Sequence, residues 1–365
     1  MDYFDWYAAY LHRSCPVADA HRDLVTEVYR RRRDGETGVL NKYHKKEWLK
    51  SGVNLIFASL FLGTDELEEC KVDGAILRGA LLTKAMEMLA AFYADLEETK
   101  GRVALVTDRD SLLRTTAKRG LSRRQRIGVL LYLEGLDVLE GEPELLRCFY
   151  AMGVRGASLT WNERSELPNV FARGTGEKCR AAVCGGTEEP PITDKGVQAL
   201  FLMEQLGIFV DSSHLSRQAA WLLPSFTKKP YAATHSNGAA VVEHRRNLTE
   251  EEIKEVAKRG GVIGVNGYRE FNCRIPDGIK GEKRSNCEPE GCSYICALCA
   301  QIFYLLESAG EDCVGFGLNL GEGNFLEDTT QLPALTAELL RRGMSVETVK
   351  KILGGNWIRY LLQTI

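Results

Sequence analysis

The chain has 365 residues, of which 44% are hydrophobic and 27% are charged, and its formal net charge at pH 7 is −3. This length suits one large core or two modest domains, and the composition excludes a disordered chain. A net charge so close to zero provides no basic field that would draw the protein to nucleic acid or to an acidic membrane surface. We therefore interpret the arginine clusters at residues 30–33 and 123–126 as solvated helix faces or helix ends.

The first residues, MDYFDWYAAYLHRS, lack the basic segment and long apolar run of a secretion signal. No stretch approaches the roughly 18 apolar residues of a membrane span, and the last residues do not resemble a lipid-anchor signal. Eleven cysteines, an odd number spread along the whole chain, favour reduced thiols over a disulfide framework. We therefore expect a cytoplasmic protein without a membrane span.

Short apolar runs alternate with longer helical patterns along almost the whole chain, which is typical of a parallel sheet with crossover helices. The predicted strands are 16–21, 53–60, 103–107, 128–133, 155–160, 207–211, 230–234, 261–265 and 313–318. Nine candidates compete for the eight places of a barrel, so one of them, with 103–107 as the first choice, lies outside it. The expected fold class is α/β, a TIM-like (β/α)8 barrel forming a single domain over residues 1–365.

Helix signals support this order of elements. Thr249 and Glu252 form a capping-box pattern before EEIKEVAKR, and TDKGVQALFLMEQLG ends at Gly207. The stretches 163–193 and 269–291 are rich in Gly, Pro and charged residues and are predicted as long loop insertions. In a barrel of this kind such loops lie at the C-terminal face of the strands, where active sites form.

A cluster of cysteines near residue 290 has two possible interpretations. Its spacing matches no common zinc or iron–sulfur pattern, and part of it falls inside SYICALCAQIFYLL, which is typical of a buried helix. Packing of small apolar thiols is favoured, and a second metal centre is the alternative. The cysteines concerned are Cys287, Cys292, Cys296 and Cys299.

Several predicted strands end in a residue that can bind a metal, as in PVADAHRD, LLYLEG, IFVDSSH and YAATHS. Parallel barrel strands bring such ends together, and residues two apart on a strand share a face. Three imidazoles and two carboxylates suit zinc, with manganese, cobalt or iron possible. His12, His44 and His244 lack this setting and are predicted as surface or loop residues. The candidate metal ligands are His21, Asp23, Glu134, His214 and His235.

These motifs resemble those of the membrane (renal) dipeptidase family, the zinc peptidases of family M19 with an amidohydrolase-like barrel. The resemblance covers roughly residues 15–360. DAHRDL at 19–24 is similar to the family's D-G-H-N-D-L. The other matching pieces are LEG at 133–135, DSSH at 211–214, THS at 234–236, HRRNLTEEE at 244–252, GGVIGVN at 260–266 and GGNWIR at 354–359.

The resemblance implies two divalent metal ions, with zinc expected. His21 and Asp23 would bind one ion, His214 and His235 the other, and Glu134 would bridge them. A metal-bridging hydroxide would then attack the amide of a dipeptide. Arg246 matches the family's substrate-binding arginine, whose planar guanidinium suits a carboxylate, and a rim salt bridge is the alternative for it. The family also favours a homodimer.

Two departures from the family pattern fall on its catalytic residues. LTWN replaces L-T-H-N, so Trp161 stands where a histidine would bind substrate and stabilise the intermediate. GLNLGEG replaces G-x-D-F-D-G, so Asn319 and Gly321 stand where aspartates would be, and an amide cannot accept a proton at neutral pH. Glu322 could replace the missing acid only by reaching inward from the loop.

Such losses typically cost about 10² to 10⁴ in rate for an acid–base group and about 10² to 10³ for an oxyanion donor. Trp161 also fills space and offers stacking in place of a titratable nitrogen. The first hypothesis is a dipeptidase-like metal-dependent hydrolase of a dipeptide or similar small amide, with Glu134, Asn319 and Trp161 as candidate catalytic residues. Its proton handling would be atypical, because Trp161 and Asn319 replace a histidine and an aspartate of the family. The alternative is a catalytically impaired member that binds metal and a small carboxylated ligand.

Overall fold

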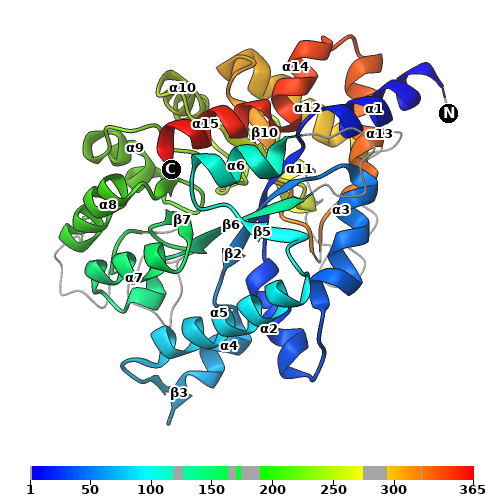
Figure 1. The fold of residues 1–365 in the computed structure, drawn as a ribbon. Helices are drawn as coiled ribbons and strands as arrows, with labels where there is room; N and C mark the ends of the chain where they lie inside the picture. Colours follow the sequence, from blue (N-terminus) through cyan, green and yellow to red (C-terminus); the bar gives the residue numbers. More distant parts are fainter. Residues whose placement is uncertain (1, 118–125, 163–169, 174–189, 274–293, 322) are drawn as a thin grey trace, which may run out of the picture.

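A computed structural model describes most of the chain. The described residues are 2–117, 126–162, 170–173, 190–273, 294–321 and 323–365. Figure 1 shows most of the strands in the centre of the molecule with the helices around them, and β3 at the lower edge. The strands are β1 (Ala18–Arg22), β2 (Leu55–Leu60), β3 (Lys71–Val72), β4 (Ala75–Ile76), β5 (Val103–Leu105), β6 (Ile127–Glu134), β7 (Val154–Ser158), β8 (Phe209–Asp211), β9 (Ile263–Val265) and β10 (Val314–Phe316).

The helices follow the strands in the alternating order expected for an α/β chain. The α-helices are α1 (Tyr3–Ser14), α2 (Leu24–Arg33), α3 (Lys45–Ser51), α4 (Thr64–Glu69), α5 (Ala80–Glu98), α6 (Arg109–Thr116), α7 (Leu146–Ala151), α8 (Asp194–Leu206), α9 (Arg217–Phe226), α10 (Glu250–Lys258), α11 (Arg269–Asn272), α12 (Tyr294–Ala309), α13 (Leu332–Arg341), α14 (Val346–Lys350) and α15 (Asn356–Thr364). Shorter 3₁₀ or π turns are η1 (Leu40–His44), η2 (Asp137–Leu139), η3 (Pro143–Leu145), η5 (Thr329–Gln331) and η6 (Lys351–Gly355).

The parallel strands form a TIM-like barrel, as predicted. β1, β2, β6, β7 and β8 pair in that order, and β9 pairs with β10. Single parallel bridges, Asp211 to Ala232 and Ala233 to Ile263, join the two sheets through the segment 231–234. On the far side, the backbone N–H of Leu318, just after β10, donates to Asp19 on β1 over 2.8 Å. The circuit is therefore β1, β2, β6, β7, β8, segment 231–234, β9 and β10.

β5 is the surplus strand, which confirms the expectation for residues 103–107. It pairs with the first residues of β6, from Ile127 to Val129, whereas β7 pairs with the later residues of the same edge, from Leu131 onward. The same edge of β6 thus pairs first with β5 and then with β7. β5 adds to the sheet without occupying a place in the barrel.

The expected strand at 230–234 is shorter than predicted. Only Ala232 and Ala233 form bridges, because Pro230 has no backbone N–H and the N–H of Thr234 donates to the Asp211 side chain over 2.9 Å. The backbone of Thr234 also packs closely against Gly264 and Gly317, where a Cβ atom would overlap its carbonyl oxygen. The absence of a side chain at Gly264 and Gly317 therefore lets the backbone of β9 and the residue after β10 approach segment 231–234 closely.

Aromatic side chains close the barrel at the end where its strands begin. Phe57 and Phe209 lie inside with ring centroids 5.7 Å apart, and Trp357 of α15 packs on Phe57 at 5.1 Å. The Trp357 indole donates to the carbonyl of Phe316 over 3.0 Å, which fixes α15 against β10. This apolar plug leaves the opposite end of the barrel, where the strands terminate, for polar side chains.

The predicted helix signals are confirmed. Thr249 and Glu252 form a reciprocal capping box at the start of α10, and Gly207 ends α8 in the left-handed conformation. Cys299 is buried in α12 and Cys296 is half-buried there, whereas Cys287 and Cys292 lie outside the described residues. Among the described residues, no helix combines the length and apolar character needed to cross a membrane.

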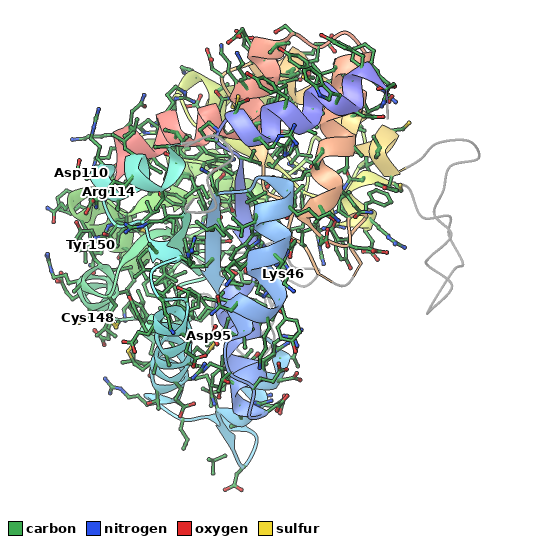
Figure 2. All side chains as sticks on the ribbon, turned by 45° about the vertical axis from the view of Figure 1, so that its right-hand side comes forward. Lys46, Asp95, Asp110, Arg114, Cys148 and Tyr150 are labelled. Atoms are coloured by element: carbon green, nitrogen blue, oxygen red, sulfur yellow. The ribbon has the colours of Figure 1, made fainter. Side chains whose placement is uncertain are left out.

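The prediction that His12 and His44 are surface or loop residues is wrong, because both are buried, His12 in α1 and His44 in η1. The His12 ring contacts the Ser51 carbonyl at 2.6 Å and the Thr336 hydroxyl at 2.9 Å, so it ties α1 to α3 and α13. Asp95 of α5 plays a similar structural role, and its position beside the blue helices is labelled in Figure 2. Its carboxylate accepts hydrogen bonds from Arg32 and from the backbone of Val39 and Leu40.

Candidate metal centre and substrate cavity

A register shift in β1 turns His21 into the barrel. Ala18 faces the interior, and strict alternation would turn His21 outward. Between Asp19 and Arg22 the pairing with β2 shifts by one residue. Such a bulge reverses the faces, so that His21 points inward and Arg22 points outward to Glu47, at 3.6 Å. Asp23 directly follows the strand and accepts a hydrogen bond from Ser59 over 2.6 Å.

The remaining candidate ligands also lie where strands end. Leu130, Tyr132 and Glu134 share the inner face of β6, and Glu134 is its last residue. His214 follows β8 with a positive φ of 72°, an uncommon conformation for a non-glycine residue. His235 follows the bridge residues Ala232 and Ala233.

These five side chains, here called the histidine–carboxylate cluster, converge around Glu134. Oε1 of Glu134 lies 2.9 Å from Nε2 of His214 and 3.4 Å from Nε2 of His235. Oε2 lies 3.8 Å from Nε2 of His21, which is 3.4 Å from Asp23. The two oxygens of one carboxylate thus face different imidazoles, and the rings of His21 and His235 adjoin each other with centroids 3.8 Å apart.

Each of the three histidines has its other ring nitrogen engaged by a polar group. Nδ1 of His21 contacts the Tyr132 hydroxyl, Nδ1 of His214 lies 2.8 Å from the Asn162 amide oxygen, and Nδ1 of His235 lies 2.8 Å from the Thr234 hydroxyl. With Nδ1 protonated, these contacts leave the Nε2 lone pairs directed toward Glu134. This is the arrangement that metal-binding histidines usually show.

The pKa values of the ionisable groups in the cluster depart strongly from their ordinary values. Burial raises the pKa of the Glu134 carboxyl to about 8. Burial opposes the charged form of His21, but Glu134 and Asp23 outweigh it and raise the pKa of this imidazole to about 9. Burial and the neighbouring His21 and His214 hold the pKa of His235 well below its ordinary value. The buried carboxylate of Glu134 therefore needs positive charge beside it, which protons or divalent cations can supply.

The donor set fits borderline divalent metal ions. His21, Glu134 and His235 each offer a ligand atom within 4.8 Å of the others, and all three are buried. Nε2 of His214 lies only 2.7 Å from Nε2 of His235. Two imidazole nitrogens that both lack a proton would repel at this separation, whereas a cation between the ligands would bring them together favourably.

The cluster forms the floor of a cavity of about 340 Å³. Apart from His235, which lies buried beneath, every candidate site residue lines it, including Arg246, Trp161 and Asn319. The further lining residues are Phe61, Asn162, His244, Arg245, Tyr268, Glu270 and Phe271. Sequence patterns separated by more than two hundred positions therefore meet in one cavity.

Arg246 is buried at the cavity edge rather than exposed in a rim salt bridge. Only 6% of its surface is accessible, and its guanidinium donates to the His235 carbonyl over 3.4 Å. Burial lowers the pKa of Arg246 to about 10. A desolvated guanidinium in contact with a cavity is well suited to bind a carboxylate.

Both departures from the family pattern lie in this cavity. Trp161 stacks beside His214 with centroids 5.7 Å apart, and Asn319 adopts a left-handed backbone with φ of 52°. A Cβ atom on Gly321 would meet nothing within 4 Å, so space exists for a side chain there. Glu322 lies outside the described residues.

The sequence did not indicate several residues that line the cavity or contact the imidazoles of the cluster. Tyr132 could have been found, because it lies two residues before Glu134 on the same strand face. His244 was predicted to be an ordinary loop residue, yet it lines the cavity beside Arg246. Thr234 and Asn162 adjoin predicted site residues, but their contacts with the imidazoles depend on the fold.

The fold is shared with known structures. The chain superposes on the probable dipeptidase PvdM of Pseudomonas aeruginosa with a TM-score of 0.79, at 17% identity over 99% of this chain and 98% of that one. A metallopeptidase of Rhodobacter sphaeroides, solved with a phosphinate mimic of the dipeptide L-Ala-D-Ala, superposes with a TM-score of 0.75, at 20% identity over 96% and 100%. These likenesses confirm the barrel fold.

Sequence comparison gives the family. An uncharacterized dipeptidase of Schizosaccharomyces pombe is 28% identical over 244 residues, which cover 66% of this chain and 53% of the fungal protein. The chain therefore spans about half the length of that relative. The model of the membrane dipeptidase family matches residues 7–364. The chain belongs to the membrane dipeptidase family, peptidase family M19, a family of metal-dependent hydrolases.

Proposed function

We propose that this protein hydrolyses the amide bond of a dipeptide or a similar small amide. The observation that carries the proposal is the convergence of three imidazole Nε2 atoms on the two oxygens of Glu134 at the floor of a cavity. Metal-ligand geometry of this kind supports hydrolysis without a covalent intermediate. The dipeptide mimic in the Rhodobacter sphaeroides structure supports a substrate of this size.

The ligand groups support a site for two ions, with zinc as the proposed metal. His21 and Asp23 would hold one ion beside Oε2 of Glu134, while His214 and His235 would hold the other beside Oε1. Bound divalent ions would lower the pKa of a water molecule and polarise the scissile carbonyl. The protein contributes the fixed orientation of the imidazoles through Tyr132, Asn162 and Thr234.

Arg246 would hold the substrate carboxylate. Its guanidinium is anchored on the His235 carbonyl, next to the cluster, so a carboxylate bound there places the adjoining amide over Glu134. The pairing of a planar guanidinium with a carboxylate also fixes the direction of the substrate. Proton transfer would be atypical, because Asn319 cannot accept a proton and Trp161 offers no titratable nitrogen.

A second candidate function is the binding of metal and a small carboxylated ligand without turnover. The presence of Asn319 and Trp161 at the cavity surface favours this candidate, since neither side chain can exchange a proton at neutral pH. The intact set of ligands is common to both candidates.

Purified protein loaded with zinc and assayed against a dipeptide mixture separates the two candidates. Turnover that His214→Ala abolishes would support the hydrolase. A matched control is His12→Gln, because His12 is buried in the contact between α1 and α13, outside the cavity. Absence of turnover in the wild type and in the double variant Asn319→Asp, Trp161→His would rule out the hydrolase and leave the binding protein.

A further inference from the structure

Two aromatic rings form one side of the cavity. Phe61 follows β2 and Trp161 follows β7, and these strands flank β6, which carries Glu134. The two rings have centroids 4.9 Å apart and an angle of 48° between their planes. We call Phe61 and Trp161 the aromatic wall. Both rings line the same cavity as the carboxylate of Glu134.

Trp161 is held rigidly next to the cluster. Its ring stacks on His214 at 5.7 Å with an interplanar angle of 29°. Its backbone nitrogen lies so close to Gly135 that a Cβ atom there would be 3.0 Å away, and the adjoining Asn162 contacts His214. A group that packs against the indole is therefore a neighbour of a metal-ligand imidazole.

The opposite side of the cavity is basic. His244, Arg245 and Arg246 come from the loop after segment 231–234, which lies across the ring of strands from β2, β6 and β7. The Arg246 guanidinium lies 5.8 Å from the centroid of the Phe271 ring, which packs at its side. Among the described lining residues outside the cluster, Glu270 is the one carboxylate. The cavity thus has an apolar side, a cationic side and the cluster between them.

We propose that the preferred substrates are amides with an aromatic ring on the acyl side and a free carboxylate on the amine side. The ring would pack in the aromatic wall and the carboxylate would face Arg246, so that the scissile amide lies over Glu134. This inference rests on the proposed function. In the reaction, water adds to the acyl carbon, the C–N bond breaks, the acyl half leaves as a carboxylate and the amine takes up a proton.

The tilt of the two rings favours a flat partner over a small aliphatic one. The two rings touch each other, so a substrate ring would pack against their cavity side, where it can stack on one ring and meet the edge of the other, the preferred aromatic geometries. A methyl group would leave most of both faces in contact with water. Two kinds of molecule share this chemistry, namely dipeptides with an aromatic first residue and amino acids with an aromatic acyl group.

Affinity of the zinc-loaded protein for phosphinic analogues tests the inference without requiring turnover. Calorimetry would compare analogues of Phe-Gly with Ala-Gly, and of benzoylglycine with acetylglycine. We expect at least one aromatic analogue to bind about tenfold or more tightly than its aliphatic partner. The pair that shows the preference identifies the source of the ring.

Variants then assign the preference to the aromatic wall. Trp161→Ala and Phe61→Ala should each reduce the aromatic-to-aliphatic ratio to about threefold or less. Trp221→Ala, which removes a tryptophan that is 72% exposed on α9, should leave it unchanged. A ratio near one for both pairs in the wild type, a ratio that survives Trp161→Ala, or no binding of any analogue would overturn the inference. Failure of the proposed function alone would appear as binding with this preference but no hydrolysis of the matching amides.

Discussion

The tautomer and orientation of each imidazole in the cluster depend on an uncharged polar group that contacts its Nδ1 atom. His235 is the clearest case, because the Thr234 hydroxyl lies 2.8 Å from its Nδ1 and donates to Asp211 over 2.5 Å. Asp211 also accepts from the backbone N–H groups of Ser213 and Thr234. A hydroxyl carries one proton, and Thr234 donates it to Asp211, so none is left to donate to His235. The hydroxyl can therefore only accept from His235, which fixes the tautomer with Nε2 available as a ligand.

Thr234→Val should weaken zinc binding about 10- to 100-fold, because it removes the acceptor that fixes the His235 tautomer while keeping the shape of the side chain. Competition with a chromophoric chelator measures the affinity. Thr336→Val is the matched control, since Thr336 makes the equivalent contact with His12 at 2.9 Å, outside the cavity. Equal zinc affinity in wild type and Thr234→Val would contradict the assigned role.

Asn319→Asp should raise kcat/KM for a dipeptide by about 10²-fold, because it supplies a carboxylate able to exchange a proton at the cavity surface. Aspartate tolerates the left-handed backbone seen at φ 52° almost as well as asparagine, so the fold should persist. Asn319→Ala keeps the position but adds no acid and serves as the control. An unchanged rate in a folded Asn319→Asp variant would show that another step limits turnover.

At the scale of single elements, the sequence predicted positions better than orientations. The strand end carrying His21 and Asp23 was identified from its pattern, but the alternation of Ala18 and Ala20 would have turned His21 outward. The bulge that corrects it arises from pairing with β2, a contact that no local pattern contains. In segment 231–234, the backbone N–H of Thr234 likewise donates to the Asp211 side chain on β8 instead of to a neighbouring strand. Only the fold brings this side chain near the segment.

Helix α10 should depend measurably on its capping box. Thr249 accepts from the N–H of Glu252 over 3.2 Å, and Glu252 accepts from the N–H of Thr249 over 2.7 Å. Thr249→Ala should lower the free energy of unfolding by about 1 kcal/mol, as determined by urea denaturation. Thr249→Ser retains the hydroxyl and should lose much less. Similar losses in the two variants would mean that the cap contributes little.

The packing of α2 on η1 should make stability sensitive to acid. Burial opposes ionisation of Glu27. The His44 ring 3.4 Å away, the charge of Arg22 and the hydrogen bond from Arg31 outweigh it and lower the pKa of this carboxyl from 4.5 to about 2. Because the folded-state pKa is depressed, the stabilisation is present above pH 4.5 and is lost as the pH falls toward 2.

Glu27→Gln should therefore destabilise the protein by about 1–3 kcal/mol at pH 7, and the difference from wild type should shrink as the pH falls below 4.5. Urea denaturation at a series of pH values measures it. Glu144→Gln, which changes a carboxylate with 78% exposure, is the control. A difference that stays constant with pH would contradict the ionic origin.

At the scale of the whole molecule, the sequence indicated the candidate ligands but not the cavity. His21, Glu134 and His235 could be identified because strand ends and family motifs mark them. The aromatic wall could not, since Phe61 has no motif and meets Trp161 only when β2 and β7 flank β6. The buried positions of His12 and His44 were missed for the same reason, because helix-to-helix packing places them. These contacts join residues that are far apart in sequence, so they form only when the barrel closes and cannot be predicted from local sequence patterns.

The same closure couples metal binding to the stability of the whole barrel. His21, Glu134 and His235 come from elements far apart in sequence, and unfolding separates them, so ions bound among them stabilise only the folded chain. Zinc at about a thousand times its dissociation constant should add about 4 kcal/mol to the free energy of unfolding, and a chelator should remove this increment.

His214→Ala should reduce this zinc-dependent increment in the free energy of unfolding. His12→Gln should lower stability in both conditions yet keep the increment, since His12 joins α1 to α13 outside the cavity. Thermal unfolding with zinc and with chelator measures both. An increment that His214→Ala leaves intact would place the metal elsewhere.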